Sequence, residues 1–255
     1  MRTEDWFAQG NLGEALTQAR QDVTSNPQSS GLRFLLFELL VLVEEFDQAE
    51  DELRYAAAAN PNISDGVELY LGLLSAERLR YNWMTKAQGS PNVLLKPPDY
   101  GVKFVEASSL LCEARVQEAE VLLSEGWQQV PKLSGSLDGK RFSEIRDADD
   151  VLGPFLEALA PGNYYWIPLE QIQRVEFQPK HGYQDTIWMP AYIEMKEGVR
   201  GNLWFPSLYS GTSKKSDFSK LGEVTEWERL SPNVARAYGQ RDLKFDGTLK
   251  GIRQV

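Results

Sequence analysis

The densest group of residues that could do chemistry is acidic. Asp147, Asp149 and Asp150 lie in one short stretch beside Arg146. Three such carboxylates could hold Mg²⁺ or Ca²⁺ through their oxygens and serve a metal-dependent hydrolase. The calcium-loop pattern also needs a central glycine and a closing glutamate, and this stretch does not supply them. We therefore expect these aspartates to cap a turn by accepting backbone N–H bonds, with Arg146 pairing one of them. Contact with a partner is the alternative.

Other reactive side chains are scarce, because the chain has one histidine and one cysteine. His181 lies in a turn-like stretch, and no Gly-x-Ser-x-Gly turn accompanies it as a hydrolytic triad of that kind would require. Cys112 follows two leucines in a helical pattern, which is typical of a small core residue. A zinc site cannot be assembled from these two residues alone, and no phosphate-binding glycine motif is present. We predict a protein that is not an enzyme and has no cofactor or metal.

The elements of the first half are predicted to be helices. Apolar residues recur there at steps of three and four, and Asn-Pro pairs at 26–27 and 60–61 interrupt the pattern. Residues 63–86 are predicted to form one long helix, and Pro97-Pro98 a break.

An internal repeat underlies these helices. Leu12, Ala15 and Pro27 return 34 residues later as Phe46, Ala49 and Pro61. A third copy at Val116, Ala119 and Pro131 follows a further 70 residues on, which is two periods plus a short insertion. A period of 34 residues with a small residue and a closing proline is typical of tetratricopeptide (TPR) repeats, in which helix pairs stack on their neighbours. The Trp and Leu-Gly positions of that pattern are missing, so an ordinary helical bundle remains the alternative.

The pattern changes near residues 131–136, where we place the boundary between a TPR-like helical domain, 1–132, and a β-rich domain, 137–255. Alternating residues at 191–195 and 203–205 around Glu197-Gly198 predict a hairpin. Further strands are predicted at 141–145, 155–160, 164–167, 174–177 and 225–230, and a mobile polar loop at 211–219. The predicted class is α+β, with a helical stack followed by a small barrel-like or curled sheet.

The net charge of the chain limits the classes of molecule that it could bind. The net charge is −10, and residues 1–136 carry 11 basic against 20 acidic side chains, a net of −9. An acidic surface argues against nucleic acid and could attract a basic protein segment, although it could equally serve solubility. The apolar window at 32–46 contains charged residues, which indicates a buried helix and no membrane insertion. One cysteine and no visible signal peptide favour the cytoplasm.

A stack of helix pairs offers a concave surface for a peptide or a helix. The first helix of each pair would line it, which suggests a set of partner-binding candidates. They are Arg33, Phe37, Leu40, Phe104 and Ser108, together with Asp147, Asp149 and Asp150. Phe37 and Leu40 could instead belong to the core, since helical apolar stripes face a core.

Several motifs together resemble one known family. They are Arg146-Asp147-Ala148-Asp149-Asp150, Leu152-Gly153-Pro154, Gly162-Asn163-Tyr164-Tyr165-Trp166-Ile167-Pro168, Trp188-Met189-Pro190-Ala191, Phe205-Pro206-Ser207-Leu208-Tyr209, and the early Gly10-Asn11-Leu12 with Glu14-Ala15. In these the chain resembles the ImpE/TagJ (SciE-type) accessory proteins of bacterial type VI secretion systems. The run from Ile145 to Pro168 is the most specific part.

The resemblance implies a cytoplasmic, non-enzymatic accessory protein. It implies a partner, the small contractile-sheath subunit TssB, bound through that subunit's N-terminal helix. It also implies a role in sheath handling or recycling beside the disassembly ATPase ClpV. No site residues are carried over from the family. The alternatives are a generic TPR-like scaffold that self-associates or binds another protein, and the hydrolase at the three aspartates.

Overall fold

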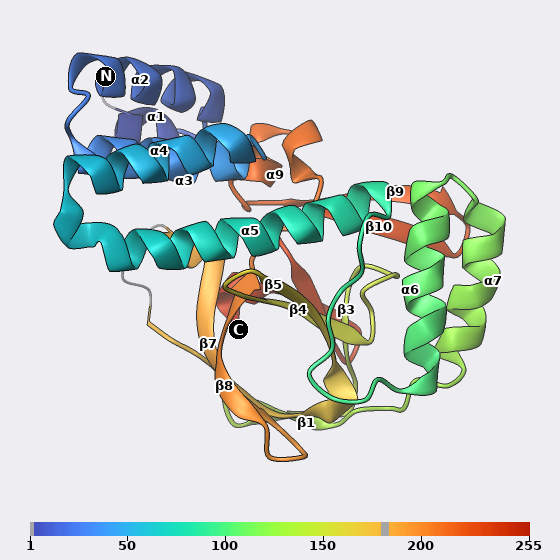
Figure 1. Cartoon of the computed structure of the whole chain (residues 1–255). Helices are drawn as coiled ribbons and strands as arrows, with labels where there is room; N and C mark the ends of the chain where they lie inside the picture. The colour runs from blue at the N-terminus through green and yellow to red at the C-terminus, as the bar shows by residue number, and fades with distance from the viewer. Residues whose placement is uncertain (1–2, 180–183) are drawn as a thin grey trace.

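The computed structural model describes residues 3–179 and 184–255. Helices occupy the first half: α1 (Thr3–Ala8), α2 (Leu12–Ser25), α3 (Ser30–Leu42), α4 (Phe46–Ala59), α5 (Ser64–Lys86), α6 (Asp99–Cys112) and α7 (Val116–Trp127). In Figure 1, α1–α4 gather at one end of the long helix α5, and the pair α6–α7 stands at its other end. The predicted long helix and the helical character of the N-terminal part are confirmed.

The repeat positions mark equivalent points of the backbone. Leu12, Phe46 and Val116 are the first residues of α2, α4 and α7. The residue two positions earlier has a positive φ in each case, at Gly10 (75°), Glu44 (59°) and Ala114 (58°). The alanines three positions into these helices are buried, which lets neighbouring helices approach closely.

Strands dominate the second half. The largest sheet has the order β5-β4-β8-β7-β6 and consists of β4 (Phe155–Ala160), β5 (Asn163–Pro168), β6 (Ile172–Phe177), β7 (Trp188–Met195) and β8 (Arg200–Pro206). Three smaller sheets pair β1 (Gly135–Leu137) with β2 (Lys140–Phe142), β9 (Thr225–Ser231) with β10 (Val234–Gly239), and β11 (Asp242–Phe245) with both β3 (Ile145–Asp147) and β12 (Thr248–Gly251). The predicted β7–β8 hairpin and the strand β4 are confirmed. The strand predicted at 141–145 is split between β2 and β3.

The prediction of a barrel-like sheet is wrong. In the described part of the chain the five-stranded sheet stays open, with β5 and β6 at its edges. The β5 edge is covered by the loop after α5, because the N–H of Asn92 donates to Tyr164 O at 2.7 Å and its carbonyl accepts from Trp166 N at 3.1 Å. A loop therefore satisfies the backbone groups that a closing strand would otherwise have paired.

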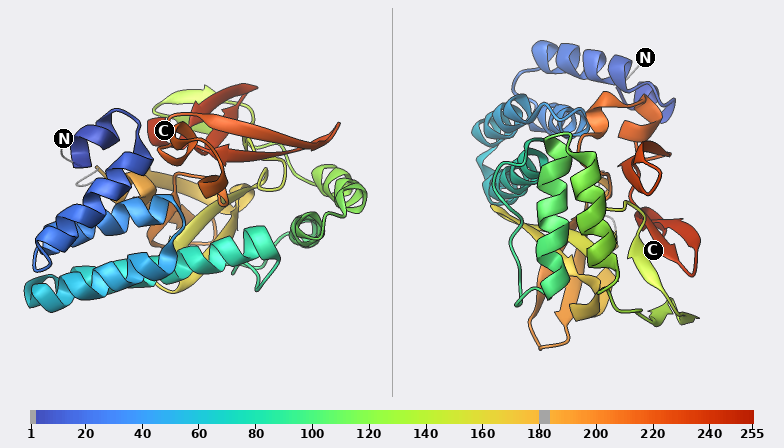
Figure 2. Two further views of the ribbon diagram at one scale, coloured as in Figure 1. Left: turned by 90° about the horizontal axis from the view of Figure 1, so that it is seen from above. Right: turned by 90° about the vertical axis from the view of Figure 1, so that its right-hand side faces the viewer.

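Both faces of this sheet are buried, which gives a layered molecule. Phe155, Leu159 and Trp166 pack in the same hydrophobic cluster as the helices. Alternate residues, among them Leu156 and Met189, join a second cluster on the opposite face, with Leu243 of β11. Seen from above, α5 lies on one side of the sheet and the last strands of the chain on the other (Figure 2). The helical and sheet parts thus share one core.

The segment 211–219, expected to be a mobile loop, is instead packed. It contains a 3-10 turn (Thr212–Lys214) and α9 (Asp217–Lys220), and Thr212 and Ser219 are buried. Its polar groups bond to the helices, which explains its composition. Glu44 accepts the N–H of Gly211 at 2.7 Å, and Asp217 Oδ2 accepts the N–H of Leu12 at 3.1 Å, where α2 begins.

Among residues 3–179 and 184–255, none of the helices combines the length and the apolar character that a membrane span needs. A short helix, α8 (Gln184–Ile187), precedes β7. His181, considered above as a catalytic base, lies outside the described residues.

Candidate functional site

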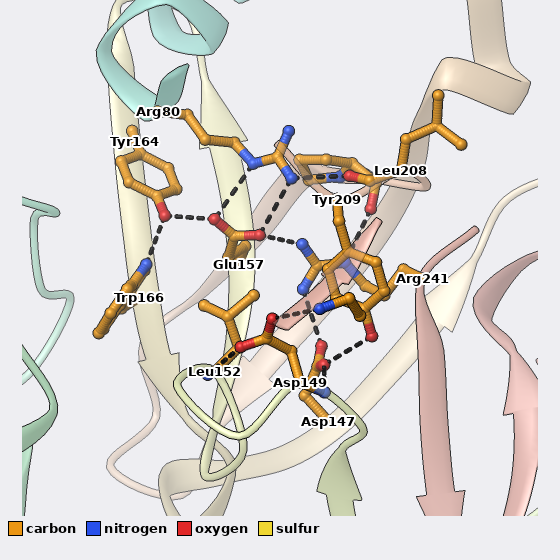
Figure 3. Close-up of polar contacts among 12 residues, drawn as sticks. Arg80, Asp147, Asp149, Leu152, Glu157, Tyr164, Trp166, Leu208, Tyr209 and Arg241 are labelled. Carbon is orange, nitrogen blue, oxygen red and sulfur yellow. Dashed lines mark hydrogen bonds and ion pairs between the residues drawn. The ribbon is translucent and has the colours of Figure 1, made fainter. Parts of the chain in front are cut away.

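A buried ion network joins the long helix to the sheet. Arg80 of α5 contacts Glu157 of β4 with two nitrogens, Nε to Oε1 and Nη2 to Oε2, each at 3.1 Å (Figure 3). The same guanidinium donates to Glu77 at 2.5 Å and to the carbonyl of Leu208 at 2.7 Å. The Arg80 and Glu157 side chains are 3% and 0% exposed. Such a pair is buried only where additional hydrogen bonds satisfy both partners, and this one has them.

Arg241, between β10 and β11, extends the network to the acidic stretch. Its Nη1 lies 2.9 Å from Asp147 Oδ2, its Nη2 contacts Glu157, and its Nε donates to Pro206 O at 3.1 Å. Tyrosine and tryptophan side chains complete the set. Tyr164 donates to Glu157 and accepts from Trp166, Tyr209 donates to Asp147 at 2.8 Å, and Trp188 donates to Glu77 at 2.9 Å.

The charges of the network set opposite directions for two pKa values. Burial alone would raise the pKa of Glu157, but the guanidinium groups of Arg80 and Arg241 outweigh it and lower the pKa to about 2. Burial raises the pKa of Asp147 to about 7, although Arg241 opposes this rise, and the neighbouring Asp149 carboxylate adds to it. The difference follows from the partners, since Glu157 meets two guanidinium groups and Asp147 meets one.

The three predicted aspartates are structural. Asp149 Oδ1 accepts the N–H groups of Val151 and Leu152 at 2.9 and 3.2 Å. Asp147 Oδ1 accepts the N–H of Asp149 at 2.9 Å, and Asp150 pairs with Arg146 at 2.6 Å. The expectation of turn-capping aspartates with Arg146 as partner is confirmed.

The same contacts oppose the hydrolase alternative. Asp149 Oδ2 accepts from Arg236 at 2.8 Å and from Ala237 N at 2.9 Å, and Asp150 Oδ2 accepts from Ala235 N at 2.8 Å. Arginine and amide donors thus occupy the oxygens that a cation would need. In the described part of the chain, no group of three or more His, Cys, Asp or Glu side chains could hold a metal ion.

The space beside the network is small. A cavity of about 30 Å³ is lined by Glu44, Glu77, Arg80, Trp188 and Tyr209, among others. That volume suits a water molecule, whereas small-molecule sites need roughly 300 Å³ or more. The network was not predicted from the sequence, although one signal existed: Glu157 interrupts the apolar run Phe155–Ala160.

The residues predicted to line a partner surface fall mostly in the core. Phe37, Leu40, Phe104 and Ser108 are at most 1% exposed, so a partner could reach them only if the helices separated. Phe37 and Leu40 are therefore core residues, the alternative considered for them above. In α3, the apolar helix that motivated self-association, Leu36, Leu39 and Leu42 are buried as well. Arg33 keeps a little exposed surface and pairs with Glu52 at 2.6 Å. Cys112 is half-buried, with its Sγ 3.5 Å from Met84 O.

An open apolar groove does exist beside these residues, between the first turns of α3 and α5. Its volume is about 380 Å³, within the range of binding sites. Its lining comprises Ser30, Gly31, Phe34, Leu35 and Glu38 from α3, with Gly66, Val67 and Tyr70 from the start of α5 and Ile63, which directly precedes α5. Phe34 and Tyr70 meet edge to face with centroids 5.2 Å apart, which makes a firm aromatic wall.

These features define an α+β protein with a helical layer on an open antiparallel sheet, a structural ion network and a surface groove. Comparison with known proteins adds a similarity to one family. Residues 139–255 match the family model described as "ImpE protein". The chain is also 26% identical over 228 residues to the type VI secretion system accessory component TagJ of Pseudomonas aeruginosa, covering 89% of this chain and 81% of that protein. The resemblance to the ImpE/TagJ family is therefore confirmed.

A solved structure shares the fold. The crystal structure of protein VPA1032 from Vibrio parahaemolyticus superposes with a TM-score of 0.91 at 20% identity, over 98% of this chain and 94% of that one. The arrangement of helices and sheets is common to both proteins.

Proposed function

We propose that this chain is a non-enzymatic accessory protein of a type VI secretion system that acts in the cytoplasm. The observation that carries the proposal is the similarity to TagJ, an accessory component of such a system, across 89% of the chain. The absence of catalysis is supported by the occupied aspartate oxygens and by the small cavity beside the ion network. A net charge of −10 supports a protein partner over nucleic acid.

The partner we propose is the N-terminal helix of the small contractile-sheath subunit, of the TssB type. The chain would thereby assist sheath handling or recycling, with an indirect link to the ClpV-type ATPase. A TPR-like stack would provide the binding surface. Support for that interpretation comes from the equivalent starts of α2, α4 and α7 and from the buried alanine three residues into each. Arg33 and Asp150 stay predictions as contact residues.

The division into 1–132 and 137–255 also stays a proposal. The helical part would carry the partner, and the sheet would hold the helices in position through Arg80 and Glu157. Residues of both parts pack in one hydrophobic cluster, which is consistent with a sheet that holds the helices in position.

The test is titration calorimetry of the purified chain with the intact small sheath subunit and with the same subunit lacking its N-terminal helix. We expect binding of the intact subunit at about 10 μM or tighter, which corresponds to about 7 kcal/mol, and loss of binding on deletion of the helix. Equal binding of both forms, or none of either, would refute the proposed partner.

A further inference from the structure

We infer that the groove between α3 and α5 is the docking site for a basic amphipathic helix, whose apolar stripe enters the groove and whose lysine or arginine side chains flank it. The inference rests on the proposed function in one respect, namely that the partner is a protein helix. It adds the place on this chain and the chemistry of the occupant.

The first argument is the type of backbone that surrounds the groove. Both walls are α-helices, whose interior N–H and carbonyl groups already bond within each helix. The groove therefore offers no strand edge on which an extended peptide could pair. Apolar walls formed by Phe34, Leu35 and Val67 instead match the stripe that an amphipathic helix presents at positions i, i+3, i+4 and i+7.

The second argument is the pair of glycines in the lining. Gly31 and Gly66 lie in the first turns of α3 and α5, both are exposed, and a Cβ added to either would meet nothing within 4 Å. Neither has a positive φ, and glycine in a helix costs about 0.5–1 kcal/mol relative to alanine. Packing within the chain explains Gly72 of the same helix, which touches Pro161, but it does not explain these two. Glycine at these positions lowers the walls and lets another helix approach closely.

The third argument is charge. Among the lining residues, Glu38 is the one carboxylate, and it is largely buried. Asp65 and Glu68 are exposed on α5 on either side of Gly66 and Val67. Arg33, the nearest basic residue on α3, is already paired with Glu52. No lysine or arginine is among the described residues that line the groove, so its surroundings favour positive charge on the occupant.

The experiment measures fluorescence anisotropy of labelled peptides with the full chain at about 0.15 M salt, where weak long-range attraction is screened. One peptide is a designed helix with a leucine stripe flanked by lysines, and its counterpart has glutamates in place of the lysines. Gly66→Phe and Gly31→Phe obstruct the two sides of the groove. Gly13→Phe is the control, because Gly13 is an exposed glycine in the first turn of α2 with the same free space.

We expect the lysine peptide to bind the original chain at least about tenfold more tightly than the glutamate peptide. Gly66→Phe and Gly31→Phe should each weaken the lysine peptide by about tenfold or more, as loss of a central contact does, and Gly13→Phe should leave it unchanged. Circular dichroism confirms that each variant is folded. Equal affinity of the folded groove variants and the control would overturn the site, and equal affinity of the two peptides would overturn the charge preference.

The sheath subunit's N-terminal helix, tested as a third peptide, separates this inference from the proposed function. If it binds the original chain and the groove variants equally, the partner stands and the groove is wrong. If it does not bind while the lysine peptide does so in a groove-dependent way, the groove stands and the partner is wrong. If neither peptide binds the original chain, both are wrong.

Discussion

The contact between α5 and the β4–β5 turn can be tested by replacing glycine with alanine at two positions of α5, where we expect opposite effects on stability. Gly72 faces Pro161, and a Cβ added at Gly72 would lie 2.6 Å from Pro161 Cβ and 3.0 Å from its Cα. Gly72 O also accepts the N–H of Gly162 at 2.8 Å. Since carbon atoms pack best at about 3.5–4.0 Å, Gly72→Ala forces the helix and the turn apart by roughly 1 Å.

The magnitude follows from two terms. Overpacking costs about 1–3 kcal/mol, and alanine returns up to about 1 kcal/mol of helix propensity. Gly66→Ala, where the added Cβ meets nothing, receives only the favourable term. The difference in unfolding free energy between the two variants thus isolates the overpacking cost of about 1–3 kcal/mol.

The assay is urea or thermal denaturation of both variants beside the original chain. At this chain length 1 kcal/mol corresponds to about 2–4 °C in Tm, so the two substitutions should separate clearly. We expect Gly66→Ala to melt at or above the original chain and Gly72→Ala to melt below Gly66→Ala. Equal stabilities would refute the direct seating of α5 on the sheet.

Other predictions concern the buried network and the segment that caps α2. Glu157→Gln leaves two buried guanidinium groups undercompensated and should cost about 3–5 kcal/mol, whereas Glu176→Gln, in an exposed ion pair, should cost under about 1 kcal/mol by urea denaturation. Because the pKa of Glu157 falls from 4.5 to about 2 on folding, its contribution of about 3 kcal/mol to the unfolding free energy is present above pH 4.5 and is lost as pH falls toward 2. Denaturation at several pH values should show this loss of stability in the original chain and not in Glu157→Gln. Asp147 acts in the opposite sense: because its pKa rises from 3.8 to about 7 on folding, its contribution is fully present below pH 3.8 and is lost as pH rises to about 7, which the same denaturation series should show. Asp217→Ala should cost about 1 kcal/mol through loss of the cap on α2, and Lys220→Ala, which removes only an ion pair with Asp217, should cost less; equal costs would contradict the cap.

The sequence was most informative where structure depends on neighbours along the chain. The three-and-four spacing predicts the helices, and the 34-residue offset finds the starts of α2 and α4, which have a positive φ two residues earlier in both cases. Alternation around a glycine turn predicts β7 and β8 in the same way.

The sequence was least informative where polar residues form hydrogen bonds between distant parts of the chain. Segment 211–219 resembles a loop because its composition is polar, yet Gly211 and Ser213 bond to Glu44, which lies in the other half of the chain. The Arg80–Glu157 pair is also remote in sequence, 77 residues apart. Such contacts leave no periodic pattern, and only a charge inside an apolar strand, as at Glu157, could have indicated them.

The partner-binding candidates show the same limit. Helical periodicity identifies one apolar stripe on α3, but it does not distinguish the part that packs inward from the part that borders a groove. Phe37 and Leu40 face the core, while Phe34 and Leu35, on the same helix, line the groove. The distinction depends on where α5 packs against α3, which is a property of the tertiary structure.

Amide hydrogen exchange of the full chain, with and without the intact small sheath subunit, tests the central claim that this protein binds a helix of another protein through its helical layer. The account predicts slower exchange on binding at residues 30–38 and 63–70, with no change in α2. Slower exchange confined to the sheet, or none at a subunit concentration well above 10 μM, would contradict it.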